Sequence, residues 1–425
     1  MRKTLMAIIS ATLVATLAGC AAPSASADEV RSEKPREAFP DVAAEDLNTL
    51  NDGNNAFAFD LYHQIVEGSD NLFYSPYSIS IALGMTYAGA RNETEQQMAQ
   101  AMHFELPQAQ LHTAFNSLDQ ELNARGEGAQ GKDGEGFRLN IVNAIWGQKN
   151  YSFLPDFLDT LARNYGAGLR VLDFQGAPDP SRIIINDWVE QQTEDRIQDL
   201  IPQGAINVLT RLVLTNAVYF NAAWESQFKE NSTSAGPFHL LDGAEVSIPM
   251  MRQTSGFRYA SGGDFEAVEL PYDGHELSMV ILLPAAGHFE SFEDSLDYGV
   301  VESAIDGLQG GQVALTMPRF KMETDFNLND ALSALGMSAA FDPPSADFSG
   351  MDGGRDLHIS DVIHKAFVDV DEAGTEAAAA TAVIMEATSA PVGPVQVTID
   401  RPFIFLIRDI ETSSILFVGR VMNPE

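Results

Sequence analysis

Cysteine and basic residues are scarce in this sequence of 425 residues. It has one cysteine, Cys20, and 25 basic side chains against 60 acidic ones, which gives a formal net charge of −35. One cysteine excludes a disulfide framework and a cysteine-rich zinc site. The negative charge excludes a body that binds nucleic acid, heparin-type polyanions or anionic membranes through basic patches. An acidic surface of this kind stays soluble in salt, which screens the repulsion between carboxylates.

Catalytic and metal-binding motifs are missing as well. The chain has no Gly-x-Ser-x-Gly elbow, and His275-Glu276 lacks the second histidine of a His-Glu-x-x-His zinc motif. Residues 126–132 have the spacing of a phosphate loop, but Asp133 stands where a Ser or Thr would hold magnesium. We therefore expect no metal, no cofactor, no catalytic residues and no enzymatic activity. A hydrolytic lipoprotein enzyme is the alternative, and it would need a nucleophile motif that is not found.

Residues 1–19 have the pattern of an export signal. Two basic residues precede the apolar run 5–17, which is too short to span a bilayer comfortably. The run is followed by Ala18, Gly19 and Cys20, which resembles a bacterial lipoprotein signal, in which the cysteine receives lipid. An ordinary signal peptide with a chance cysteine is the alternative. We expect lipidation of Cys20 and anchoring to the cell envelope, at the outer membrane if the cell is Gram-negative, or else an extracellular protein.

The rest of the chain divides into a tether and a body. Residues 20–45 are rich in Ala, Ser, Pro and charge, which predicts a flexible tether. Residues 46–425 show no linker and no repeat, so we expect a single large domain. Helical spacing occurs mostly in the first half and strand patterns mostly in the second, which favours an α+β fold. The expected helices are 55–66, one opened by Ser75-Pro76, 92–103, 107–123, 153–165 and 181–196; the expected strands are 137–146, 212–220, 267–270, 277–283, 403–407 and 415–421.

The stretch 371–391, DEAGTEAAAATAVIMEATSAP, carries most of the functional information. Its alanine content favours a helix by propensity alone. Read at a period of two, Glu376 and Glu386 share one face, while the opposite face from Thr375 to Ala387 is small or apolar. This alternation predicts a strand that can bury one side.

Here the sequence closely resembles the inhibitory members of the serpin family. The hinge signature of that family matches EAGTEAAAAT, which comprises Glu372, Ala373, Gly374, Thr375, Glu376, Ala377, Ala378, Ala379, Ala380 and Thr381. Further family motifs follow in order: NLFYSPYSI at 71–79, TNAVYFNAAW at 215–224, MPRF at 317–320, HKA at 364–366, RPF at 401–403 and FVGRVMNP at 417–424. The resemblance covers about residues 47–425.

The resemblance implies a fold and a mechanism. The fold is a single domain with a main mixed β-sheet that accepts an inserted reactive-loop strand, further sheets and about nine helices. The reactive loop spans about 372–400. A target protease cleaves the loop and forms an acyl-enzyme, and the loop then inserts into the main sheet and traps the protease covalently. The protein is expected to be a monomer.

Counting along the loop from the hinge, as the resemblance directs, places the scissile bond between Thr388 and Ser389. No Lys or Arg lies between residues 366 and 400, which argues against a trypsin-like target. A small β-branched Thr suits an elastase-like or subtilisin-like protease. A cysteine protease as target and a non-inhibitory serpin are the alternatives.

The resemblance also implies two supporting clusters. Ser75, Ser78, Asn216 and His364 form a hydrogen-bonded shutter under the main sheet. At the end of the sheet where the loop enters, called the breach, Glu372 pairs with Arg319 beside Trp224.

Overall fold

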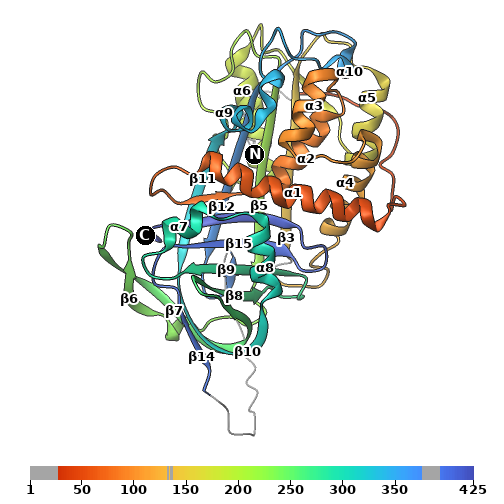
Figure 1. Cartoon of the computed structure of the whole chain (residues 1–425). Coiled ribbons are helices and arrows are strands. Elements are labelled where there is room, and N and C mark those ends of the chain that lie inside the picture. Colours follow the sequence, from red (N-terminus) through yellow and green to blue (C-terminus); the bar gives the residue numbers. More distant parts are fainter. Residues whose placement is uncertain (1–26, 132–133, 135–136, 376–392) are drawn as a thin grey trace, which may run out of the picture.

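The computed structural model describes residues 27–131, 134, 137–375 and 393–425 (Figure 1). Ten α-helices occur in this described part, one more than the nine expected: α1 Ala44–Ile65, α2 Pro76–Tyr87, α3 Asn92–Ala101, α4 Gln108–Asn123, α5 Pro155–Thr160, α6 Pro178–Gln192, α7 Phe289–Asp294, α8 Tyr298–Asp306, α9 Asn329–Leu332 and α10 Ser349–Asp352. The short helical turns η1 Leu161–Tyr165, η3 Ser333–Met337 and η4 Ser338–Ala340 follow helices directly, and a further turn, η2 Glu230–Ser232, lies between two strands. No helix of these ranges is both long and apolar enough to cross a membrane.

The main sheet has seven strands in the order β1-β4-β3-β5-β13-β12-β11. Their bounds are β1 Asp28–Val30, β3 Arg138–Gln148, β4 Leu169–Leu172, β5 Leu212–Ala223, β11 Phe320–Asn327, β12 Ile359–Val370 and β13 Gly374–Thr375. The sheet is mixed, because β12 and β5 run parallel and β3 and β5 antiparallel. β5 is buried along its whole length, as a central strand covered on both faces should be.

The second sheet has nine strands in the order β14-β10-β7-β8-β9-β15-β16-β2, and β6 pairs with β7. Their bounds are β2 Leu72–Tyr74, β6 Ser234–His239, β7 Glu245–Ser261, β8 Phe265–Pro271, β9 Leu277–Pro284, β10 Gln309–Pro318, β14 Val395–Thr398, β15 Phe403–Asp409 and β16 Ile415–Val421. In Figure 1, β6, β7, β10 and β14 lie at the lower end of the molecule, and α2 to α5 gather at the upper right. The α+β fold expected from the sequence is confirmed.

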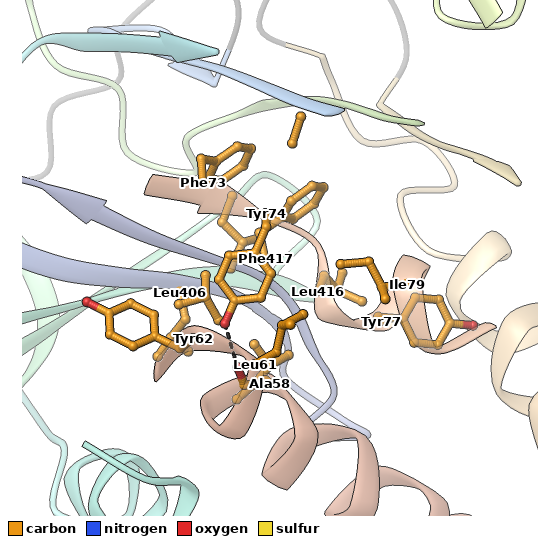
Figure 2. Packing of buried hydrophobic residues seen from close by; sticks show 14 of the residues in the cluster. Ala58, Leu61, Tyr62, Phe73, Tyr74, Tyr77, Ile79, Leu406, Leu416 and Phe417 are labelled. Carbon is orange, nitrogen blue, oxygen red and sulfur yellow. Dashed lines mark hydrogen bonds between the residues drawn. The ribbon is translucent and has the colours of Figure 1, made fainter. Parts of the chain in front are cut away.

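The core lies where helices α1 and α2 meet the two sheets. Phe73 of β2 stacks on Phe417 of β16 with the ring centroids 5.1 Å apart. The hydroxyl of Tyr74 donates a hydrogen bond to the carbonyl oxygen of Ala58 in α1 (Figure 2). Burial of these rings contributes about 25 cal/mol per Å² of apolar surface, so the helices and the second sheet are joined into one body.

Helix α2 begins as its sequence predicts. Ser75 is its N-cap, and the Ser75 hydroxyl oxygen accepts a hydrogen bond from the backbone N–H of Ser78 at 3.2 Å. Pro76 occupies the first helical position, where a missing N–H has no cost. This cap fixes the start of α2 directly beneath the main sheet.

The N-terminal segment differs from the predicted tether over residues 27–43. β1 pairs antiparallel with β4 at the edge of the main sheet. Arg36 donates from Nε to Asn116 and from a terminal nitrogen to Asp119, each at 2.7 Å, and both partners lie on α4. The amide of Glu37 donates to the carbonyl of Arg163 at 2.8 Å. A polar composition suggested a free chain, but these polar groups bind long-range partners that sequence spacing does not reveal.

Candidate functional site

The hinge occupies a gap in the main sheet. β12 and β5 pair in parallel from Ile359 and Leu212 up to Ala366 and Val218. Beyond this point β13 lies between them and pairs antiparallel with both, so that Thr375 is opposite Val370 on one side and Ala222 on the other. The side chain of Thr375 is 1% exposed. Extended chain can therefore enter the sheet here, and the two residues of β13 already lie in it.

Gly374 is the residue that makes this entry possible. A Cβ at this position would lie 2.2 Å from the carbonyl oxygen of Ala222 and 2.7 Å from Cα of Ala223. Both contacts are with backbone of the central strand, which cannot move aside locally. Glycine alone allows the hinge to approach β5 this closely.

The carboxylate of Glu372 holds the start of the hinge. It forms an ion pair with Arg319 and accepts a hydrogen bond from the hydroxyl of Thr233. Its backbone carbonyl accepts from the amide of Phe228 at 2.9 Å. Burial opposes ionisation, but the hydrogen bonds from Thr233 and Arg319 together hold the pKa of Glu372 below its ordinary value. The predicted pairing of Glu372 with Arg319 is present in the structure, and Thr233 was not foreseen.

Trp224 anchors the same turn through its backbone and its ring. The Trp224 amide donates to the carbonyl of Ala373, and the indole Nε1 donates to the carbonyl of Asp371, both at 2.9 Å. The indole stacks on the ring of Tyr272, with centroids 4.7 Å apart and planes 9° apart. Tyr272 in turn meets Thr375, with 2.9 Å between the two hydroxyl oxygens.

A second cluster lies beneath the sheet, where β5 and β12 still pair. Asn143, Asn216 and His364 are direct neighbours in one row across β3, β5 and β12. Asn216 donates to Oδ1 of Asn143 and to the hydroxyl of Ser78. The structure thus brings the four predicted shutter residues together, since Ser75 also reaches His364 through its backbone. Asn143 belongs to the same network and was missed, because a lone Asn in a strand carries no local signal.

His364 is held neutral in a single tautomer. Its Nε2 accepts from the backbone N–H of Ser75 at 3.2 Å, so Nδ1 carries the proton and donates to Oδ1 of Asn216. The side chain is wholly buried, and burial lowers its pKa from the ordinary value of 6.5 to about 3. The network therefore ties α2 to both strands that border the gap.

Several predicted site residues lie outside the described residues. These are the reactive bond Thr388–Ser389, the hinge residues Glu376, Ala377, Ala378, Ala379, Ala380 and Thr381, and the lipidation site Cys20. Within the ranges that are described, no three His, Cys, Asp or Glu residues lie close enough to hold a metal ion. The hinge and the row beneath it both lie where β5 and β12 part to admit β13.

Known proteins share this architecture. A family model of serpins, described as serine protease inhibitors, matches residues 52–424. A serpin-like protein of Thermococcus kodakarensis is 42% identical over 373 residues, which cover 87% of this chain and 85% of that protein. The leukocyte elastase inhibitor of Homo sapiens is 39% identical over 390 residues, which cover 89% of this chain and 100% of the inhibitor.

A solved structure agrees with these sequence relatives. The native state of tengpin, a thermophilic serpin, has a TM-score of 0.82 with this chain at 28% sequence identity. The match covers 94% of this chain and 100% of tengpin.

Proposed function

Because this chain belongs to the serpin family, whose model spans residues 52–424, we propose that it inhibits a serine-type protease as a suicide substrate and is not itself an enzyme. The protease cleaves between Thr388 and Ser389 and stays bound as an acyl-enzyme. The loop then inserts between β5 and β12 and carries the protease with it before hydrolysis is complete. As one strand, residues 375–388 would span about 45 Å.

The observation that supports this function best is the seated hinge. Thr375 is buried between β5 and β12, and Gly374 fits only without a Cβ. An inhibitor must insert its loop faster than the acyl-enzyme is hydrolysed, and a strand that has begun to insert favours this outcome. Small residues from Ala377 to Ala380 add little bulk between the two strands.

The target proposed is an elastase-like or subtilisin-like protease. The residue before the scissile bond is Thr388, and no Lys or Arg occurs between residues 366 and 400. The elastase inhibition in the name of the human relative is consistent with this choice. We also propose that the protein is a monomer, exported and anchored to the cell envelope through lipid on Cys20.

The test mixes residues 21–425 with pancreatic elastase and with subtilisin. We expect a complex that survives denaturing electrophoresis and a released fragment that begins at Ser389, identified by intact mass. Thr388→Arg should shift inhibition toward trypsin, whose pocket binds a cation. Cleavage of the Thr388–Ser389 bond without a stable complex would instead indicate that the protein is only a substrate of the protease. A different fragment mass would show that another bond is cleaved.

A further inference from the structure

Tyr272 lies where the second sheet meets the main sheet. It follows β8 directly, bridges to Trp224 as an isolated antiparallel pair, and donates its amide hydrogen to the carbonyl of Leu277 at 2.9 Å. Its ring stacks on Trp224 and meets the ring of Phe220 edge-on, with centroids 5.1 Å apart and planes 78° apart. The ring is thus held by Phe220 on β5 and by Trp224 next to it, and the backbone is held by Leu277 of β9; among these partners, Trp224 also binds the hinge.

The hydroxyl of Tyr272 is directed into the gap between β5 and β12. It lies 2.9 Å from Oγ1 of Thr375, and both side chains are at most 1% exposed. Either hydroxyl can donate to the other, since each is both a donor and an acceptor. Loss of one partner would leave the other hydroxyl buried beside an apolar group, which is costlier than losing a bond in water.

We propose that Tyr272 is a positioning residue for strand insertion, whose hydroxyl holds Thr375 between β5 and β12 before a protease arrives. The inference rests on the proposed inhibitory function and deepens it. A strand that starts from a seated first residue has already lost the entropy of closing the loop onto the sheet. After cleavage it only has to extend along β5 and β12, which speeds insertion relative to hydrolysis.

The first test measures the hinge without any protease. Hydrogen–deuterium exchange is followed in peptides that cover residues 370–375, using the whole chain with Cys20→Ser. Tyr272→Phe keeps the ring and removes the hydroxyl, and we expect about three- to tenfold faster exchange in these peptides. Thr375→Val should have the same effect, and Thr375→Ser, which keeps a hydroxyl, should exchange like the parent.

The double variant distinguishes a direct interaction between the two hydroxyls from a general loss of packing around Tyr272. If the two hydroxyls act on each other, Tyr272→Phe combined with Thr375→Val should exchange no faster than either single variant. Additive effects, or faster exchange throughout β8 and β9, would mean that Tyr272 only supports local packing, and the proposal would be wrong.

The second test measures the reaction. With a protease that the parent inhibits, Tyr272→Phe should raise the number of inhibitor molecules consumed per trapped protease about twofold or more, with Thr375→Ser as the matched control. An unchanged ratio would overturn the proposed effect on insertion. If the parent inhibits no protease, the proposed function fails, while the exchange experiment still decides whether Tyr272 holds the hinge.

Discussion

At the scale of single residues, His364 joins three parts of the molecule next to the gap in the main sheet. It bonds to Ser75 at the start of α2 and to Asn216 on the neighbouring strand, and it belongs to β12 itself. A buried network of this kind is stable only while every member is satisfied. Protonation of His364 would remove the lone pair of Nε2 that accepts from the backbone N–H of Ser75, so this network needs the neutral ring.

The pH dependence of this residue can be tested. The pKa of His364 is about 3 in the folded protein against an ordinary value of 6.5, so its stabilisation is complete above pH 6.5 and is lost as the pH falls from 6.5 toward 3. His364→Gln should lower the free energy of unfolding by about 2 kcal/mol at pH 7. The difference in thermal midpoint between variant and parent should become smaller toward pH 4.

The comparison has an internal control. His112 is also buried and has a pKa of about 4, but it is present in both proteins and cancels in the difference. The exposed His275, changed to Gln, should leave the midpoint within about 1 °C of the parent at each pH. A gap between His364→Gln and the parent that stays constant from pH 7 to 4 would contradict the role assigned to His364.

Sequence reasoning reached the members of these clusters unevenly. Ser75 could be predicted from its local sequence, because Ser followed by Pro is typical of a helix N-terminus. His364, Asn216, Glu372 and Arg319 were identified only through the family resemblance. Asn143, Thr233 and Tyr272 were missed, because their partners lie between 65 and 139 residues away and no spacing rule reports such contacts.

At the scale of elements, the place of Thr375 as the second residue of β13 favours a small, uncharged side chain there. Thr375 is enclosed by β5 and β12, so Thr375→Arg would bury a cation without a partner. We expect this variant to be cleaved by the target protease without a stable complex on denaturing gels. Thr375→Ser should form the complex as the parent does, and full inhibition by Thr375→Arg would count against strand insertion.

The N-terminal segment is a second element with a measurable role. Arg36 binds Asn116 and Asp119 of α4 with most of its side chain covered. Arg36→Ala should lower the free energy of unfolding by about 1 kcal/mol, measured by denaturant titration. The exposed Arg355 offers a matched control, because Arg355→Ala should change it by less than about 0.5 kcal/mol. Equal free energies of unfolding for Arg36→Ala and the parent would show that the contacts of Arg36 with α4 do not stabilise the fold.

Long, regular elements were predicted best. The strands β5, β15 and β16 and the helices α3 and α4 lie close to the bounds expected from periodicity. The strand β1 was not foreseen, because a segment of three residues has no period to detect. The alternation that starts at Thr375 predicted a strand that can bury one side, but it did not indicate that β13 already lies in the sheet. Their positions follow from the edge and the gap that other strands provide.

At the scale of the whole molecule, the net charge of −35 is a source of self-repulsion that salt can relieve. Raising NaCl from about 0.05 M to about 1 M shortens the Debye length to about 3 Å, and at pH 8 the thermal midpoint should rise by several degrees. The same change near the isoelectric point, about pH 4.3, should have little effect. A midpoint that falls with salt at pH 8 would mean that attractive pairs outweigh the repulsion.

The two outer edges of the main sheet have a consequence for self-association. Unpaired strand edges at the borders of a sheet can recruit extended chain from another molecule. β1 covers the border beside β4 and itself presents Asp28 and Glu29 to solvent. At the opposite border, three of the four exposed positions of β11 are charged, namely Lys321, Glu323 and Asp325. Charge at both borders discourages intermolecular pairing, so the opening between β5 and β12 is left as the place where a strand can join, and the strand best placed to join is the molecule's own.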